Sequence, residues 1–245
     1  MKRVLIFGAT SAIAQEAAKK FAASGASLFL VGRNEEKLDA VKRDLQVRGA
    51  ARVEALTLDL AEIQEHRGAL KIATESLEGL DGVLVAHGVL PDQQVCERSV
   101  EETMRVFQIN CLSVISLLTL VADHFEAQRR GCIAVISSVA GDRGRKSNYV
   151  YGATKGALNV FLQGMRNRLY RSGVSVVTVK PGLVDSPMTT HLPKNPLFAA
   201  SSTIGEGIYR AMVRGGDEVY LPGYWRAIMA VVRGIPERIF KRMNL

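Results

Sequence analysis

The sequence predicts an α/β fold, a doubly wound parallel sheet of about seven strands with helices on both faces. Short runs rich in Val, Ile and Leu alternate along the 245 residues with longer segments in which apolar residues recur at helical spacing. The short runs are apolar at nearly every position, as expected of strands that are buried on both faces. Because 47% of the residues are hydrophobic and no linker interrupts the pattern, we expect one domain of the Rossmann type.

The expected strands cover residues 4–7, 28–31, 53–58, 82–86, 133–136, 174–179 and 218–220. Helical patterns cover residues 12–24, 34–47, 63–76, 100–128, 150–171 and 203–214. Strand and helix alternation at this spacing is typical of crossover connections between parallel strands. Ligands bind such sheets at the carboxyl ends of the strands, so the chemistry is expected in the loops that follow them.

The loop after the first strand reads GATSAIA and begins at Gly8. Gly8 stands where a positive φ is expected, while Ala12 and Ala14 fall in the first helical turn, where a methyl group is tolerated. The helix start offers free N–H groups and a partial positive charge to a pyrophosphate. Read alone, the loop fits ordinary strand–turn–helix packing equally well. As a dinucleotide loop it would supply the cofactor contacts Gly8, Thr10, Ser11, Ala12 and Ile13.

The loop after the second strand predicts which dinucleotide is used. An acidic residue there would bind the ribose 2′-hydroxyl and repel a 2′-phosphate. Gly32 occupies that position and Arg33 follows it, and a guanidinium can hold a phosphate through two hydrogen bonds. We therefore expect NADP(H) as the cofactor, with NAD(H) as the alternative. Arg33 could also be a solvated residue at a helix start with no role in binding. After the third strand, Asp59 and Leu60 are placed to contact adenine, although Asp59 also suits a helix N-cap.

Three residues in the second half of the chain carry the expected reaction. Ser138 follows the fifth strand, and Tyr151 and Lys155 share one face of a predicted helix because they are four residues apart. A nearby ammonium and an oxidised nicotinamide lower the pKa of a phenol from its usual value near 10. Tyr151 is thus expected to exchange a proton with a carbonyl or hydroxyl group, whose oxygen Ser138 would hold. Tyr-x-x-x-Lys alone is a weak motif that also describes a surface pair.

In this order the motifs resemble the short-chain dehydrogenase/reductase family over nearly the whole chain. The resemblance implies that Asp59 binds adenine, that Ser138, Tyr151 and Lys155 are catalytic, and that the carbonyl of Asn110 positions a water beside the lysine. It also implies contacts from the segments VAHG and PGLVDS, the second facing the nicotinamide carboxamide. These implied cofactor contacts are Ala86, His87, Gly88, Tyr151, Lys155, Pro181, Gly182, Val184 and Ser186.

The chain departs from the family pattern at two places. Ala12 and Ala14 replace two glycines, and VAHG retains only Gly88 of the family's Asn-Asn-Ala-Gly motif. His87 either binds the cofactor ribose or the substrate, or it packs in the core. Because the reacting groups are intact, catalysis is still expected.

The resemblance implies an NADP(H)-dependent oxidoreductase that interconverts a carbonyl and a secondary alcohol. The GATSAIA loop, the AHG segment and the tail VYLPGYWRAIM resemble a divergent branch that includes mycobacterial decaprenylphosphoryl-2-keto-pentose reductase. That branch implies a lipid-linked keto-sugar as substrate. One alternative is a catalytically idle NADP(H)-binding regulatory or scaffold protein. A sugar-nucleotide epimerase of the extended relatives would need a substrate domain for which the chain lacks room.

We expect residues 1–220 to form the dinucleotide-binding and catalytic domain and residues 221–245 a basic amphipathic extension. This extension holds five Arg and Lys residues against one Glu, half of the net charge of +8. Its apolar residues repeat at helical spacing and are interrupted at Gly234 and Pro236, which predicts two short helices. Such a segment could lie on an anionic membrane, cover the active site, or dock on its own domain or a neighbouring subunit. Residues 186–203 have no clear period and suit a mobile lid.

Composition also bears on metal sites, disulfides, membrane spans, nucleic-acid binding and oligomer surfaces. Three scattered cysteines and four histidines without ligand spacing predict neither a metal site nor a disulfide framework, which fits a reducing cytoplasm. The sequence has no uninterrupted run of 18 apolar residues, so no membrane span is predicted. Any membrane association is then expected to be peripheral, at the cytoplasmic face. No basic and aromatic run suggests nucleic-acid binding. The helices at 100–128 and 150–171 are expected surfaces for a homodimer or homotetramer.

Overall fold

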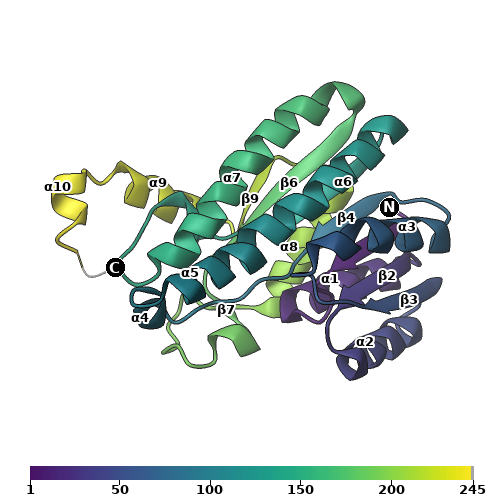
Figure 1. Ribbon diagram of the computed structural model, residues 1–245, viewed down its shortest axis with the longest axis horizontal. Helices are drawn as coiled ribbons and strands as arrows, with labels where there is room; N and C mark the ends of the chain where they lie inside the picture. The colour runs from purple at the N-terminus through teal and green to yellow at the C-terminus, as the bar shows by residue number, and fades with distance from the viewer. Residues whose placement is uncertain (244–245) are drawn as a thin grey trace.

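The computed structural model describes residues 1–243 and contains the predicted doubly wound sheet (Figure 1). Seven parallel strands lie in the order β3-β2-β1-β4-β5-β6-β9, so the direction of winding reverses between β1 and β4. All seven predicted strands are confirmed, and their ends shift by no more than two residues. The bounds are β1 Arg3–Phe7, β2 Ser27–Gly32, β3 Arg52–Thr57, β4 Gly82–Val85, β5 Gly131–Ile136, β6 Val174–Pro181 and β9 Glu218–Leu221.

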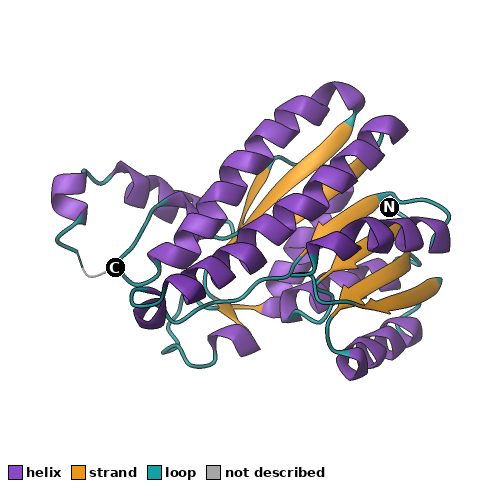
Figure 2. Ribbon diagram, viewed as in Figure 1, coloured by secondary structure: helices purple, strands orange, loops and turns teal. Residues whose placement is uncertain are grey.

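Helices cover both faces of this sheet (Figure 2). The longer ones are α1 Ala12–Ala23, α2 Glu35–Val47, α3 His66–Ser76, α5 Val100–Phe107, α6 Ser113–Gln128, α7 Tyr149–Leu169 and α8 Ser201–Arg214. The chain also forms short elements that the periodicity did not predict, because two to four residues are too few to show a period. These are α4 Gln93–Cys96 and the small strand pair β7 Val184–Asp185 and β8 Ala199–Ala200, which interrupts the predicted lid.

The alternation of side chains along the buried strands divides the core into two layers. Val4 and Ile6 of β1 pack with α1, α2 and α8 on one face. Leu5 and Phe7 of the same strand pack with α3, α6 and α7 on the other. Apolar residues at every strand position therefore serve two different helix layers, which explains the continuous apolar runs in the sequence.

The helix predicted at residues 100–128 is interrupted. A π-helical turn, Gln108–Leu112, joins α5 to α6, and the Ser113 hydroxyl donates to the Ile109 carbonyl oxygen at 2.8 Å. By length and composition alone Val100–Gln128 is apolar enough to cross a membrane, although it holds no uninterrupted run of 18 apolar residues. Half of its most apolar stretch is buried within the fold, as in the core helix of a doubly wound sheet.

The C-terminal segment forms the two predicted short helices, α9 Trp225–Gly234 and α10 Glu237–Phe240. Trp225 and Met229 of α9 are buried against Val139, and α10 projects away from the sheet (Figure 1). Arg143 joins the two helices, since its guanidinium donates to the carbonyl oxygens of Val232, Arg233 and Ile235 and to the Glu237 carboxylate. The tail thus docks on its own domain. The last two residues of the predicted extension 221–245 lie outside the described residues.

Candidate active site

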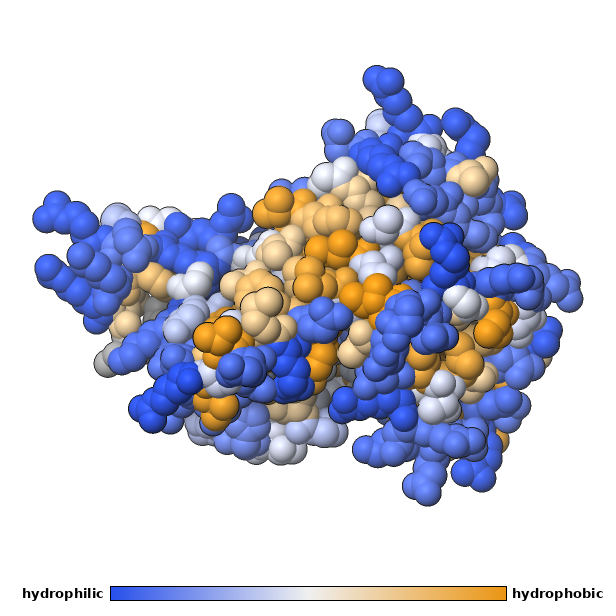
Figure 3. Space-filling model, in the orientation of Figure 1, coloured by the Kyte–Doolittle hydropathy of each residue, from blue (hydrophilic) through white to orange (hydrophobic). Residues whose placement is uncertain are grey.

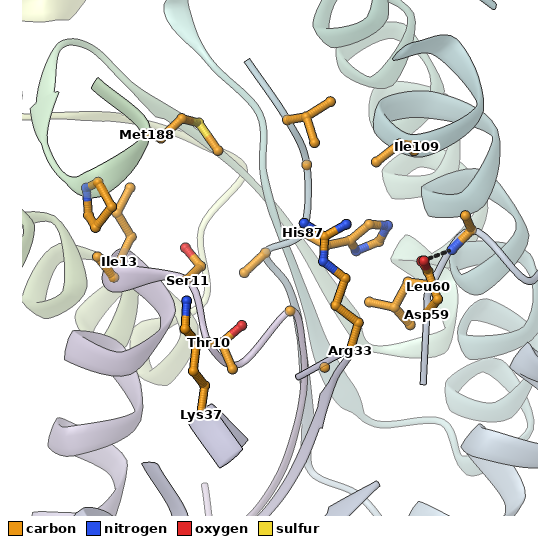
Figure 4. A pocket seen from close by; sticks show the side chains of 18 of the residues that line it. Thr10, Ser11, Ile13, Arg33, Lys37, Asp59, Leu60, His87, Ile109 and Met188 are labelled. Atoms are coloured by element: carbon orange, nitrogen blue, oxygen red, sulfur yellow. Dashed lines mark hydrogen bonds between the residues drawn. The ribbon is translucent and has the colours of Figure 1, made fainter. Parts of the chain in front are cut away.

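A cavity of about 400 Å³ opens at the carboxyl ends of β1, β2 and β4, beside the reversal of strand order (Figure 4). This is where a doubly wound sheet binds its ligand. Most residues predicted to touch the cofactor line it. They are Gly8, Thr10, Ser11, Ala12, Ile13, Gly32, Arg33, Asp59, Leu60, Ala86, His87, Gly88 and Ser186.

The remaining predicted residues do not line this cavity. Asn110 lies in the π-helical turn between α5 and α6, and Ser138 lies just after β5. The others lie on α7, at the end of β6, in the turn after it or on β7; they are Tyr151, Lys155, Pro181, Gly182 and Val184. The residues predicted to bind the adenosine half of the cofactor thus lie apart from those predicted to react, and we call these two groups the adenosine end and the reaction end. The sequence analysis missed several lining residues, which are Lys37, Leu58, Ala61, Val89, Ile109, Pro187 and Met188. The sequence held a signal for Lys37, because it follows Arg33 by four residues at the start of the predicted helix. It held no such signal for the apolar lining residues.

Gly8 satisfies the backbone requirement predicted for it. Its φ is +77°, and a methyl group there would lie 2.5 Å from the His87 nitrogen and 2.9 Å from the Ala86 carbonyl carbon. The glycine therefore permits the close approach of the β4 loop as well as the left-handed turn. Ala12 and Ala14 lie in the first turn of α1, as predicted for positions that tolerate a methyl group.

The start of α1 is free to receive an anion. Ser11 is its N-cap residue, yet its hydroxyl makes no capping hydrogen bond. Arg33 and Lys37 reach into the cavity from the β2–α2 side (Figure 4). Among residues 1–243, neither cation lies within ion-pair distance of a carboxylate. Two uncompensated charges beside an open helix start fit a phosphate group.

Asp59 and His87 flank the same cavity. One Asp59 oxygen accepts the Ala61 backbone N–H at 2.9 Å, so it stabilises the turn rather than a helix start. The His87 Nε2–H donates to the Ser113 hydroxyl at 2.8 Å, since that hydroxyl already donates to Ile109. Burial and the Lys155 charge lower the pKa of His87 to about 3. His87 is therefore neutral, and its buried Nδ1 remains an acceptor without a partner among the described residues.

Asn110 and Lys155 meet beside Gly88. Asn110, in the π-helical turn, is fully buried, and its side-chain amide exchanges two hydrogen bonds with the backbone of Val89, at 2.7 and 2.8 Å. The Lys155 Nζ donates to the Ile136 carbonyl oxygen at 3.0 Å, and burial lowers its pKa to about 8. A methyl group at Gly88 would lie 3.1 Å from the Asn110 Oδ1 and 3.7 Å from the Lys155 Nζ. The glycine keeps the space between these two groups open.

The Tyr151 phenol differs from the expectation in one respect. Burial raises its pKa to about 12, although hydrogen bonding with Ser138 acts in the opposite direction. The Lys155 Nζ is 5.7 Å from the Tyr151 ring centroid, so the predicted lowering by the ammonium does not prevail in the protein alone. The phenol is consequently protonated at neutral pH, as an acid for carbonyl reduction must be.

The turn after β6 holds the remaining predicted contacts. Gly182 lies under the indole of Trp225, which leaves no room for a side chain, and its N–H donates to the Leu221 carbonyl oxygen at 3.0 Å. Val184 is buried in β7, and Ser186 begins a short helical turn that includes Pro187. Ser186 and Pro187 line the cavity, whereas Gly182 packs against α9 and does not line it.

Known proteins resemble this chain over its whole length. Residues 2–197 match the family model described as short chain dehydrogenase. An uncharacterized oxidoreductase of Mycobacterium tuberculosis is 32% identical over 241 residues, which cover 98% of this chain and 96% of that protein. Another, from Streptomyces coelicolor, is 31% identical over 243 residues, covering 99% and 96%.

A solved structure agrees in fold. The crystal structure of levodione reductase superposes with a TM-score of 0.83 at 22% identity, covering 92% of this chain and 98% of that one. At this identity the likeness concerns the fold alone. The family model covers most of the chain, and the two bacterial relatives match it from end to end. The protein belongs to the short-chain dehydrogenase/reductase family and is an NAD(P)-dependent oxidoreductase.

Proposed function

We propose that the protein is an NADP(H)-dependent carbonyl reductase or alcohol dehydrogenase in which Tyr151 is the acid–base group. The observation that carries this proposal is the arrangement of a protonated phenol, the Ser138 hydroxyl and the buried Lys155 ammonium at the carboxyl end of the sheet. When bound, the nicotinamide cofactor supplies or accepts the hydride. Four residues of this chain then handle the proton and the substrate oxygen.

Each of the four has a distinct task in the reducing direction. The Ser138 hydroxyl donates to the substrate oxygen and orients it, and Tyr151 gives that oxygen its proton. The Lys155 ammonium favours the phenolate that this transfer leaves behind. Asn110 sits in a π-helical turn, a break in regular helix that is frequent at functional sites, and its carbonyl oxygen would hold a water that returns the proton.

The Tyr151→Phe variant tests the mechanism, because it removes the phenol hydroxyl and keeps the ring. NADPH binding, followed by the fluorescence of the cofactor, should be retained while reduction of ketones and keto-sugars falls by about 10² to 10⁴. Near-normal turnover would contradict the mechanism. If the wild-type protein binds NADPH but reduces no member of a broad carbonyl panel, the alternative of a catalytically idle NADP(H)-binding regulatory or scaffold protein is favoured.

The preference for NADP(H) over NAD(H) rests on Arg33 and Lys37. Both line the cavity without a carboxylate partner among the described residues, so a 2′-phosphate would compensate their charge. Arg33→Asp should raise the KM for NADPH by about 10- to 100-fold and lower that for NADH, since charge-assisted hydrogen bonds are replaced by repulsion. Arg130→Asp, just before the amino end of β5 and outside the cavity, is the matched control. Unchanged KM values for both cofactors would refute the preference.

The C-terminal segment supports a lipid-linked keto-sugar as the substrate class. Val231 and Ile239 are exposed, and the basic residues Arg238, Lys241 and Arg242 are exposed beside them. Exposed apolar and basic side chains on the tail suit peripheral contact with an anionic membrane, from which such a substrate would be drawn. Flotation with vesicles containing anionic lipid should carry the full chain and not a chain that ends before Leu221. Equal flotation of both would exclude this role.

A homodimer or homotetramer is also proposed. An apolar area extends over α5, α6 and α7 on the face seen in Figure 3. The exposed large apolar residues of α5, of α7 and of the π-helical turn between α5 and α6 are Val100, Met104, Leu112, Tyr149 and Val160. Exposed apolar patches of this kind are typical of subunit interfaces. Sedimentation of the wild type against the Met104→Glu/Val160→Glu variant measures the state, and a monomeric wild type would contradict the proposal.

A further inference from the structure

A buried ion pair lies directly behind the reaction end of the site. The Lys180 Nζ is 2.6 Å from the Asp142 Oδ1, and both side chains are only 3% exposed. Asp142 ends the turn that begins after Ser138, and Lys180 immediately precedes Pro181 and Gly182. The pair therefore joins two segments that are 38 residues apart and that both lead into the active site.

Further polar groups complete the coordination of this pair. The Tyr220 hydroxyl of β9 donates to the Asp142 Oδ2 at 2.7 Å, and the Asn159 amide of α7 donates to the Oδ1 at 3.3 Å. The Glu218 carboxylate lies 2.8 Å from the Lys180 Nζ. Asp142 thus accepts from an ammonium, a phenol and an amide, and each of these donors comes from a different segment of the chain.

The network continues to the catalytic lysine. Ser137 donates from its hydroxyl to the Asn159 Oδ1 at 2.6 Å and also approaches the Lys155 carbonyl oxygen at 3.3 Å. Asn159 follows Lys155 by one helical turn. Gly141 allows this contact, because a methyl group there would lie 2.6 Å from the Lys155 carbonyl carbon and 2.8 Å from the Asn159 Nδ2. The Ser138 turn is therefore held directly against the helix that carries Tyr151 and Lys155.

Stability alone gives no reason for charges at this position. A buried ion pair commonly contributes no more to stability than a well-packed apolar pair of the same volume, because both charges lose their hydration. It differs from an apolar contact in fixing direction, since each hydrogen bond is satisfied in only one relative placement of its partners. A network that joins β6, β9, α7 and the Ser138 turn restricts how these four segments can shift against one another.

We propose that Asp142 and Lys180 are positioning residues that set the Pro181–Gly182 turn, and with it the nicotinamide end of the cofactor, against the proton donor Tyr151. This inference rests on the proposed function, since it assumes that the turn after β6 meets the nicotinamide. Tyr220 and Asn159 act through Asp142. Hydride transfer needs its reacting atoms in close register, and a displacement of about 1 Å can cost about 10²-fold in rate.

The only tryptophan of the chain offers a direct readout. Trp225 packs on Gly182, so excitation energy would pass from its indole to a reduced nicotinamide if one is held beside that turn. Titration of the intact protein with NADPH, in the absence of substrate, then gives both the affinity for the cofactor and the emission of the bound nicotinamide. The affinity reports mainly the adenosine end, whereas sensitised nicotinamide emission and its anisotropy report the reaction end.

Three variants use this readout. Asp142→Asn removes the charge, and Tyr220→Phe removes one hydrogen bond and no charge, which keeps the test available if the first variant does not fold. Asp123→Asn breaks an exposed ion pair with Arg168 on α6 and α7 and is the matched control. Asp142→Asn and Tyr220→Phe should keep the NADPH Kd within about twofold, because neither residue lines the cavity at the adenosine end. Sensitised emission and anisotropy should both fall, and turnover of any carbonyl that the wild type reduces should fall by up to about 10²-fold.

The outcomes separate the alternatives. Lower emission and anisotropy at unchanged Kd support positioning. A lower melting temperature with wild-type emission and anisotropy means that the network is only structural, and it overturns the proposal. A wild-type protein that does not bind NADPH overturns the proposed function first, and this inference with it.

Discussion

The Gly8→Ala substitution tests how the cofactor loop is built. The new methyl group would lie 2.5 Å from the His87 nitrogen, 2.8 Å from the His87 Cα and 2.9 Å from the Ala86 carbonyl carbon. These are backbone atoms, so no side chain can rotate away. Since ordinary contact begins at 3.4 Å, the β1 and β4 loops must separate by about 0.9 Å.

Two costs add at this position. A side chain at positive φ costs about 1 to 2 kcal/mol, of which the stiffer unfolded chain returns about 0.4 to 1 kcal/mol. Forcing extra atoms into a packed site costs about a further 1 to 3 kcal/mol. These ranges sum to about 1 to 4.6 kcal/mol, so the expected loss of unfolding free energy is centred near 3 kcal/mol. For a chain of this length each kcal/mol lowers the melting temperature by about 2 to 4 °C, so a decrease of about 5 to 15 °C is expected.

Gly25 provides the matched control. Its φ of +73° is close to that of Gly8, but a methyl group there would meet nothing within 4 Å. Gly25→Ala therefore isolates the conformational cost and should lower the melting temperature by only about 2 to 4 °C. Gly8→Ala should also weaken NADPH binding, because Ala86, His87 and Gly88 line the cavity and must move. Equal melting temperatures for the two variants would refute the packing argument, and an unchanged NADPH Kd for Gly8→Ala would refute the link to the cofactor.

Three other predictions concern the tail and the titrating groups. Gly182→Ala should displace Trp225, which lies against that glycine, and shift the tryptophan emission to the red; Gly223→Ala, with nothing within 4 Å, should leave the spectrum unchanged. The pKa of Lys155 near 8 predicts that kcat/KM falls as the pH rises through about 8. This decrease should move to higher pH in Lys155→Arg. A decrease at the same pH in both proteins would assign it to another group. The pKa of His87 is about 3 in the folded state and 6.5 in the unfolded chain, so on acidification the unfolded chain takes up the proton first. The stability present above pH 6.5 is therefore lost as the pH falls below 6.5. Urea unfolding should show about 1.4 kcal/mol less stability from this residue at pH 5.5 than at pH 7.5, and His87→Gln, unlike a substitution of the exposed His191, should reduce the difference.

Much of the site could be predicted from local sequence. The glycine loop, Arg33 and Asp59 each follow a strand, so the topology of a parallel sheet brings them to one edge without further information. Ile109 and Met188 were missed because they reach the same cavity from two other segments, whereas Lys37 had a local signal in its spacing of four residues from Arg33. The direction of the Tyr151 pKa also depends on burial, which motif spacing cannot show.

The sequence by itself determined the alternation of strands and helices, the order of the motifs and the family. These depend on patterns within about ten residues, where the periods of strand and helix leave a direct mark on composition. Only the tertiary structure decided that Arg143 clamps the two tail helices, that Trp225 covers Gly182, and that Asp142 pairs with Lys180. Each of these contacts joins segments about 40 or more residues apart, and which side chains meet there depends on the path of the chain around the sheet.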